Sequence, residues 1–240
     1  MHRLMAYAGA SLLGLSLAPL STASVTLMGT RQFHYCHQAK QTLTFLGDYL
    51  KAPSVLTTWV DKAPHQPLPH KAEAPFMLLP PQFKMQPNTP QKTVLLYTGS
   101  AQSCPKTQEA VYYFYFLETP LSTLTQPDTL QYLSMVKLFL RPNHLTHNHQ
   151  GGGAQLNISL DATQAYLLIH NPSPYHVTIS RWQTPSDPKL LAEPVMVAPN
   201  STLRHPLSQA AKVTLGQSIT VTALDDFGKP HRSHHRLKRP

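Results

Sequence analysis

Short apolar segments, separated by polar and proline-rich stretches, make up most of the chain. Several of them alternate apolar and polar residues, as Ser218 to Thr222 (SITVT) does. Alternation with a period of two, together with β-branched and aromatic side chains, predicts half-buried strands. No segment carries a stripe with a helical period for more than a turn or two. The predicted strands are 42–46, 55–60, 93–98, 111–117, 130–140, 155–160, 166–170, 176–182 and 218–224.

Proline and glycine refine this picture. The 23 prolines are spread along the chain, where they shorten helices but are tolerated at strand ends and turns. Short strands at near-regular spacing are typical of β-sandwiches. An aromatic-rich first half ends in a polar, histidine-rich stretch with three consecutive glycines at 151–153, which predicts a loop. We therefore expect an all-β chain with domains at 25–143 and 144–230.

The N-terminus reads as a secretory signal. Two basic residues precede an apolar run at Leu4–Leu20, and small residues follow at 21–24. A secretory signal peptide has a positively charged N-terminal region, a short apolar region and small residues before the cleavage site. The run contains two glycines and a proline and falls short of the roughly 20 apolar residues that a membrane span needs. We expect residues 1–24 to be a signal peptide, cleaved near Ala23 or Ser24.

Charge and cysteine content fit an exported protein. The chain has 20 Lys and Arg against 11 Asp and Glu, a net charge of +9. In an exported protein this excess steers an acidic partner or aids solubility, and it does not require nucleic acid. Part of it lies in residues 231–240, which we expect to be a flexible basic tail. Cys36 and Cys104 would lie in a compartment where a disulfide persists, and their spacing excludes CxxC redox and four-cysteine zinc motifs.

Known catalytic motifs are missing from the sequence. It has no GxSxG elbow, P-loop, dinucleotide-binding glycine turn or HExxH, and 11 carboxylates leave few acid–base pairs. The 14 histidines motivate a second hypothesis, a metal-handling protein. Their clusters lie in segments predicted to be flexible, without neighbours that would orient the rings, so we expect no cofactor, no functional metal site and no enzyme activity. The clustered histidines are His144, His147, His149, His231, His234 and His235.

Seven short motifs, in order along nearly the whole mature chain, resemble those of the periplasmic chaperones of the chaperone–usher pathway, which assemble pili. The segment 136–142 (VKLFLRP) resembles the family's KLFYRP signature, with Leu140 in place of an aromatic residue. Lys84 stands where arginine is common. The other segments that carry the resemblance are 29–33, 53–61, 75–85, 109–114, 171–178 and 225–228.

The resemblance implies a fold and a function. The fold is two immunoglobulin-like β-sandwich domains in an L shape. The function is to bind, fold and cap pilus subunits in the periplasm of a Gram-negative bacterium, by donor-strand complementation, and to deliver them to an outer-membrane usher. No nucleic acid or membrane partner is implied. The exposed strand edge of such a chaperone also allows a self-capping dimer when no subunit is bound.

The resemblance further implies roles for individual residues. Arg31 and Lys137 would bind the C-terminal carboxylate of the subunit, a recognition mode that charge-assisted hydrogen bonds support. The strand before Lys137 would be the donor strand, with Leu130, Tyr132 and Val136 on the face opposite Lys137. The alternative is that this strand only supplies its own domain's core.

Two further sets complete the site. Glu109, Arg141 and Asp226 match the family's interdomain salt bridge, which fixes geometry more than stability. Cys36 and Cys104 would lie in loops at one end of such a sandwich, which allows a disulfide between them. A third hypothesis, a chaperone-like structural protein without pilin clients, follows from the weak alternation before Lys137 and from the departures at Lys84 and Leu140.

Overall fold

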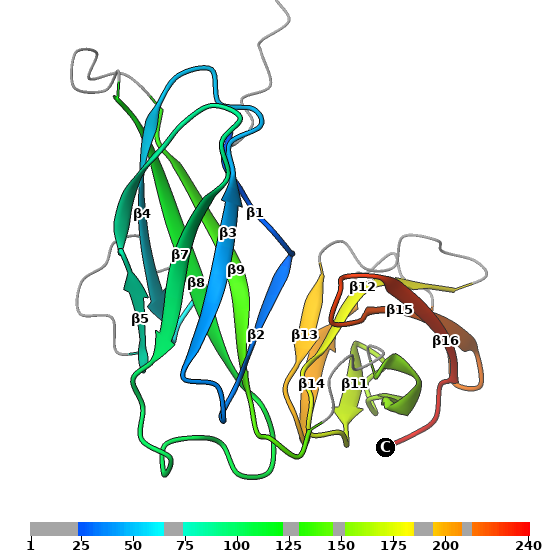
Figure 1. Ribbon diagram of the computed structural model, residues 1–240. Coiled ribbons are helices and arrows are strands. Elements are labelled where there is room, and N and C mark those ends of the chain that lie inside the picture. The colour runs from blue at the N-terminus through cyan, green and yellow to red at the C-terminus, as the bar shows by residue number, and fades with distance from the viewer. Residues whose placement is uncertain (1–23, 65–73, 122–129, 146–151, 185–193, 208–212) are drawn as a thin grey trace, which may run out of the picture.

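Two β-sandwich lobes form an L in the computed structural model (Figure 1). The structure describes residues 24–64, 74–121, 130–145, 152–184, 194–207 and 213–240. The predicted signal peptide lies outside these ranges except for Ser24. The predicted boundary at residue 143 falls between the last strand of the first lobe and the first element of the second. No helix in the described ranges is long and apolar enough to span a membrane.

The first domain packs a four-stranded sheet, in the order β1-β3-β7-β5, on a five-stranded sheet, in the order β2-β9-β8-β4-β6. Its recorded strand pairs are antiparallel except for β2 and β9, which run parallel. The strands are β1 (Thr26–Leu27), β2 (Arg31–Tyr35), β3 (Lys40–Leu46), β4 (Ser54–Asp61), β5 (Phe76–Leu79), β6 (Gln82–Met85), β7 (Gln91–Tyr97), β8 (Ala110–Pro120) and β9 (Tyr132–Arg141).

Alternate residues of these strands build the first core, because successive side chains in a strand point to opposite faces. Phe114 of β8 and Leu138 of β9 are fully buried in it. Phe45 of β3 and Leu95 of β7 meet them from the other sheet. Residues on the opposite face of the five-stranded sheet, such as Tyr113 and Lys137, point away from this core, and Arg31 on that face reaches the second domain.

The second domain packs a three-stranded sheet, β10-β11-β14, on a four-stranded sheet, β13-β12-β15-β16. Trp182, Val221 and Ile169 lie in its core. Its elements are the 3₁₀ turn η2 (Gly153–Gln155) and the strands β10 (Asn157–Leu160), β11 (Tyr166–Asn171), β12 (Val177–Gln183), β13 (Val195–Val197), β14 (Ser201–Pro206), β15 (Ser218–Leu224) and β16 (Pro230–Arg236).

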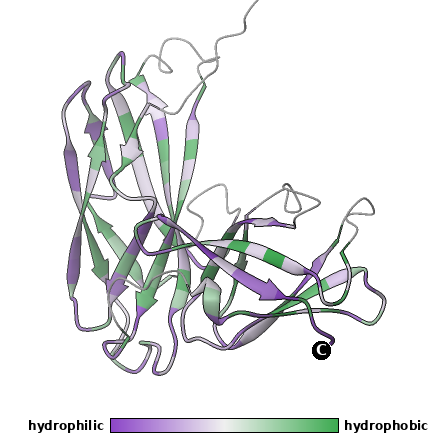
Figure 2. Ribbon diagram, turned by 90° about the vertical axis from the view of Figure 1, so that its right-hand side faces the viewer, coloured by the Kyte–Doolittle hydropathy of each residue, from purple (hydrophilic) through white to green (hydrophobic). Residues whose placement is uncertain are grey.

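The predicted flexible tail at 231–240 is wrong. Residues 230–236 form strand β16, which pairs antiparallel with β15 and is coloured as hydrophilic next to the C-terminus in Figure 2. Leu237 is 2% exposed, and its N–H donates to the Gln217 carbonyl at 2.9 Å. The segment has no apolar alternation because β16 is an edge strand, held by backbone pairing and by one buried leucine.

The all-β prediction is confirmed, and every strand that alternation predicted is present. Apart from β2, which overlaps the motif at 29–33, the remaining strands are short or lie at sheet edges. Such strands bury few side chains and leave only a weak pattern in a sequence.

Candidate functional site in the cleft between the domains

Two cations lie side by side where the first domain faces the second. In the parallel pair of β2 and β9, Arg31 is in register with Lys137. Across β9, Lys137 is also in register with Tyr113 of β8. Registered residues share a face of the sheet, so both cations project to the side away from the first core. Each is half-buried.

Neither cation is neutralised within the described residues. Burial lowers the pKa of Lys137, and the neighbouring Arg31 lowers it further. Burial also lowers the pKa of Arg31, although Asp226, Asp225 and Glu109 partly offset this. No carboxylate of the described chain forms an ion pair with either side chain within 4.0 Å. An anion bound next to Arg31 and Lys137 would therefore be stabilised electrostatically.

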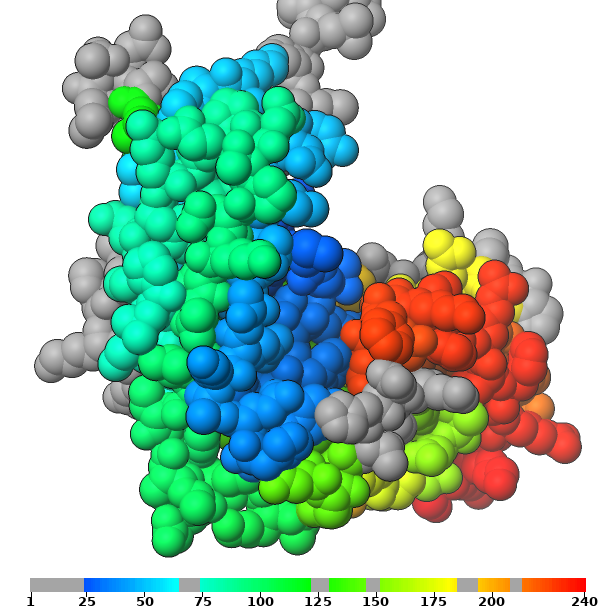
Figure 3. All heavy atoms as spheres, in the orientation of Figure 1, coloured from blue at the N-terminus to red at the C-terminus, as the bar shows by residue number. Residues whose placement is uncertain are grey.

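The second domain closes the cleft at close range. Arg31 donates to the Leu224 carbonyl at 3.4 Å. A Cβ placed on Gly228 would lie 2.8 Å from the Thr30 hydroxyl oxygen. Figure 3 shows the blue start of the first domain against the orange segment of the second. A groove beside Arg31, about 270 Å³ in volume, is lined from both domains and includes Phe227, which is 74% exposed.

Arg141 joins the two domains beneath this groove. Its guanidinium donates to Glu109 at 2.8 and 3.0 Å and to Asp226 at 2.8 and 3.2 Å. Burial alone would lower its pKa, but the hydrogen bonds and charges of Asp226 and Glu109 raise the pKa of Arg141 above its ordinary value. Glu109 also accepts from the backbone N–H and the ring of His176. The set predicted from the resemblance is thus in contact across the interface.

Aromatic residues that sequence reasoning did not single out surround this network. The guanidinium of Arg141 lies 4.5 Å from the ring centroid of Phe33 and 4.9 Å from that of Tyr175. Phe33 stacks on Phe139 at 5.2 Å. Both Phe33 and Tyr175 fall inside motif segments, at 29–33 and 171–178, which was the signal available in the sequence.

The predicted donor strand shows two different faces. Val136 is partly buried against the domain's own core, so in the free protein this side chain contributes to that core. Leu130, ahead of β9, is 63% exposed, and Tyr132 is half-buried. On the Lys137 side, Leu133 and Met135 are 45% and 41% exposed, which the sequence did not indicate.

The edge of β9 ahead of Lys137 has room for another strand. Strand β2 pairs with residues 137–141 only, while β8 pairs with residues 132–140. Among the described strands, none is in register with residues 133–136 on the β2 side. An unpaired edge of this kind is a template for a strand from another chain.

Cys36 and Cys104 form a disulfide with a Cα–Cα distance of 6.0 Å. It ties the turn after β2 to the loop before β8, at the end of the sandwich next to Arg141, whose carbonyl accepts from the Cys36 N–H at 3.1 Å. The bond therefore holds down the end of the strand that carries Arg31.

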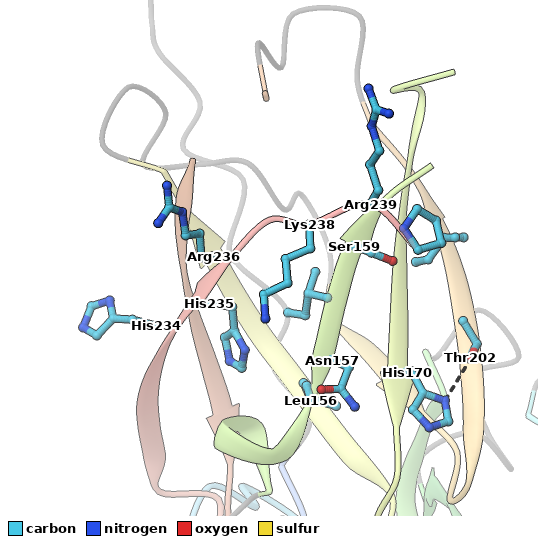
Figure 4. A pocket seen from close by; sticks show the side chains of 13 residues that line it. Leu156, Asn157, Ser159, His170, Thr202, His234, His235, Arg236, Lys238 and Arg239 are labelled. Carbon is cyan, nitrogen blue, oxygen red and sulfur yellow. Dashed lines mark hydrogen bonds between the residues drawn. The ribbon is translucent and has the colours of Figure 1, made fainter. Parts of the chain in front are cut away.

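The histidines do not gather into a metal site in the described ranges. A groove of about 530 Å³ in the second domain is lined by His170, His234 and His235, together with Arg236 and Lys238. Figure 4 shows these rings spread along the groove rather than converging. No group of three or more His, Cys, Asp or Glu in the described chain has metal-binding geometry. His147 and His149 lie outside the described residues.

Two family models match the chain. The N-terminal domain of the pili and flagellar-assembly chaperone PapD matches residues 24–146, and the C-terminal domain of the pili assembly chaperone PapD matches residues 153–235. The chain belongs to the PapD family of pilus-assembly chaperones. The family prediction made from the motifs is thereby confirmed.

Individual relatives agree with this assignment. The chain is 29% identical to the chaperone protein FimB/FhaD of Bordetella pertussis, over 92% of this chain and 90% of the relative. It is 27% identical to the chaperone protein MrkB of Klebsiella pneumoniae, over 85% of this chain and 88% of the relative. The crystal structure of the YadV chaperone has the same fold, with a TM-score of 0.73 at 24% identity, covering 90% of this chain and all of the other.

Proposed function

We propose that the protein is an exported chaperone that captures pilus subunits by their C-terminal carboxylate. The observation that carries this proposal is the pair of Arg31 and Lys137, half-buried, in register on parallel strands and without an ion pair in the described chain. A carboxylate has two oxygens, and two cationic donors grip it with bonds worth roughly 1.5–3 kcal/mol each.

The donor strand gives the subunit its second contact. An anchored C-terminus at Lys137 sets the register of the subunit strand that runs along the β9 edge. Leu130 and Tyr132 then face the subunit's apolar groove, on the same side of the strand as Val136, which continues into the chaperone's own core. Strand addition of this kind, of which chaperone–pilin complementation is an established example, gives affinity through the main chain and specificity through alternate side chains.

The rest of the proposed role follows from family membership. The family consists of periplasmic chaperones of Gram-negative bacteria, and a structure of the same fold, with a TM-score of 0.73, is the Salmonella enterica SafA pilin in complex with the SafB chaperone. The protein is accordingly exported by its N-terminal signal peptide, acts without a cofactor or catalytic chemistry, and hands its subunits to an outer-membrane usher.

Co-expression with a pilin from the same locus tests this function. The variant Arg31→Ala plus Lys137→Ala should lose subunit co-purification by at least tenfold, because the carboxylate loses both donors. Lys84→Ala plus Lys92→Ala is the matched control, since it removes two exposed cations of the same domain and should leave capture intact. Equal capture by both double variants would refute the carboxylate anchor. Failure of the wild type to capture any pilin would favour a chaperone-like protein without clients.

A further inference from the structure

Glu118, near the end of β8, is a buried carboxylate that contacts the first described residues of the chain. It is 2% exposed and shares its inward face of β8 with Phe114 and Phe116. Among the described residues no Lys, Arg or His forms an ion pair with it within 4.0 Å. Burial of an ionised carboxylate without a counter-charge is costly, so a positive charge beside Glu118 would stabilise the folded domain.

The donors that reach Glu118 come mostly from one place, residues 24 and 25. The backbone N–H of Ser24 donates to its carboxylate at 3.3 Å, and that of Val25 donates at 3.1 Å. The Ser24 hydroxyl donates to it at short range, and the Ser54 hydroxyl donates at 3.3 Å. All four donors are neutral while Ser24 is linked to Ala23.

This arrangement is fixed rather than incidental. Val25 is 2% exposed and belongs to the first core, so the residue before it is held against the end of the sandwich. The next residues continue into β1, where Thr26 pairs with Leu46 of β3. The Ser24 nitrogen therefore has little freedom to leave the Glu118 carboxylate.

We infer that signal peptidase cuts between Ala23 and Ser24, and that the α-ammonium group so formed is the counter-ion of Glu118. The inference rests on the export proposed above. Ser21 and Ala23 are the small residues that the enzyme requires before its cleavage site. Hydrolysis of the Ala23–Ser24 bond adds one water, leaving a carboxylate on Ala23 and a protonated amine on Ser24. The amine forms within hydrogen-bond distance of Glu118, so processing converts a neutral contact into an ion pair.

The mature N-terminus is thus a structural element of the first domain, and an uncut or wrongly cut chain lacks it. A hydrogen bond between charged groups is roughly twice as strong as a neutral one. Processing should therefore stabilise the folded chaperone, although it leaves Arg31 and Lys137 unchanged. Failure of this inference is distinguishable from failure of the carboxylate anchor, because each is measured on different residues.

The first experiment reads the N-terminus of the exported protein. Intact-mass analysis of periplasmic protein should give a chain that begins at Ser24. A chain that begins at any other residue would overturn the inferred cut between Ala23 and Ser24.

The second experiment is a thermodynamic cycle. A two-glycine extension before Ser24, left by a site-specific protease, keeps the backbone donor but moves the ammonium away. It should raise the unfolding equilibrium constant roughly tenfold and lower Tm by a few degrees. In Glu118→Gln, which keeps the hydrogen-bonded shape, the same extension should have no effect. An equal effect in both backgrounds, or none in either, would overturn the ion pair.

A third readout holds even where Glu118→Gln folds poorly. NMR titration of the processed wild type should place the pKa of the Ser24 α-amino group above the ordinary range of about 7.7–8.0, because the carboxylate favours its charged form. A value within the ordinary range would mean that Glu118 does not serve as its partner.

Discussion

Arg141 of the first domain and Asp226 of the second lie 2.8 Å apart, and the arginine side chain is 1% exposed. The same guanidinium reaches Glu109, also 1% exposed, at 2.8 Å. One buried cation therefore connects a carboxylate of each domain. Because a guanidinium is planar and has several fixed donors, we expect this contact to constrain the angle between the domains as well as their separation.

Removing Arg141 should be costly. Arg141→Met leaves the Glu109 carboxylate buried with its main counter-charge gone, a change that typically costs about 3–5 kcal/mol. Urea unfolding should show the loss as a lower midpoint. Arg204→Met is the control, because Arg204 is 57% exposed and lies 3.8 Å from Asp161, a surface pair worth about 0–1 kcal/mol. Similar midpoints for the two variants would show that the buried network adds nothing to stability.

Lys137 should destabilise the free chaperone. Burial and the adjacent Arg31 lower its pKa, so the folded state holds the Lys137 proton less tightly than the unfolded chain does. At neutral pH both states keep the proton, and the folded state carries the cost. Lys137→Met should therefore raise Tm by roughly 1–4 °C while it weakens subunit capture.

The pH dependence of that gain has a definite sign. Because its pKa is lowered, Lys137 loses its proton in the folded state at a lower pH than in the unfolded chain. The wild type therefore becomes more stable, relative to Lys137→Met, as pH rises toward the ordinary lysine value of 10.5. Calorimetry should show the difference in Tm shrinking over the alkaline range below this value. A difference that stays constant with pH would point to packing rather than charge as its cause.

The two faces of the donor strand can be separated by one substitution on each. Leu130 and Met135 are both substantially exposed, at 63% and 41%, so Asp at either position should leave the free protein stable. Leu130→Asp should reduce pilin co-purification more than tenfold, because a carboxylate in an apolar groove is costly. Met135→Asp should have little effect. The reverse result would assign the subunit contact to the Lys137 side of the strand.

Loss of the disulfide should weaken the first domain. Cys36 and Cys104 are separated by 68 positions, and removal of a native bond typically costs roughly 2–5 kcal/mol. Cys36→Ala plus Cys104→Ala should therefore lower the urea midpoint. Dithiothreitol should lower the wild-type midpoint to the same value and leave the double variant unchanged. A wild type that is insensitive to reduction would contradict a stabilising role.

The alternation of apolar and polar residues was sufficient to predict the core strands but not the edge strands. Residues 218–224 alternate and form β15, whereas its neighbour β16 has no apolar side chain on either face beyond its first proline, so its sequence predicts a tail. The pairing of Arg31 with Lys137 joins strands about a hundred residues apart, and no local period encodes it. Motif resemblance supplied that pair and the Arg141 network. It did not supply Glu118, whose partners at 24 and 25 become neighbours only in the folded domain.

The space between the two domains at the cleft depends on Gly228, a residue without a side chain. Its φ of +79° is one that L-residues rarely adopt, and the smallest substituent would press on Thr30 of the other domain. Gly228→Ala would act as a wedge between the arms of the L, next to the Arg31 groove rather than within it. A search for cleft variants that considers only charged residues would miss this position, although its backbone conformation and its close approach to Thr30 make it sensitive to substitution.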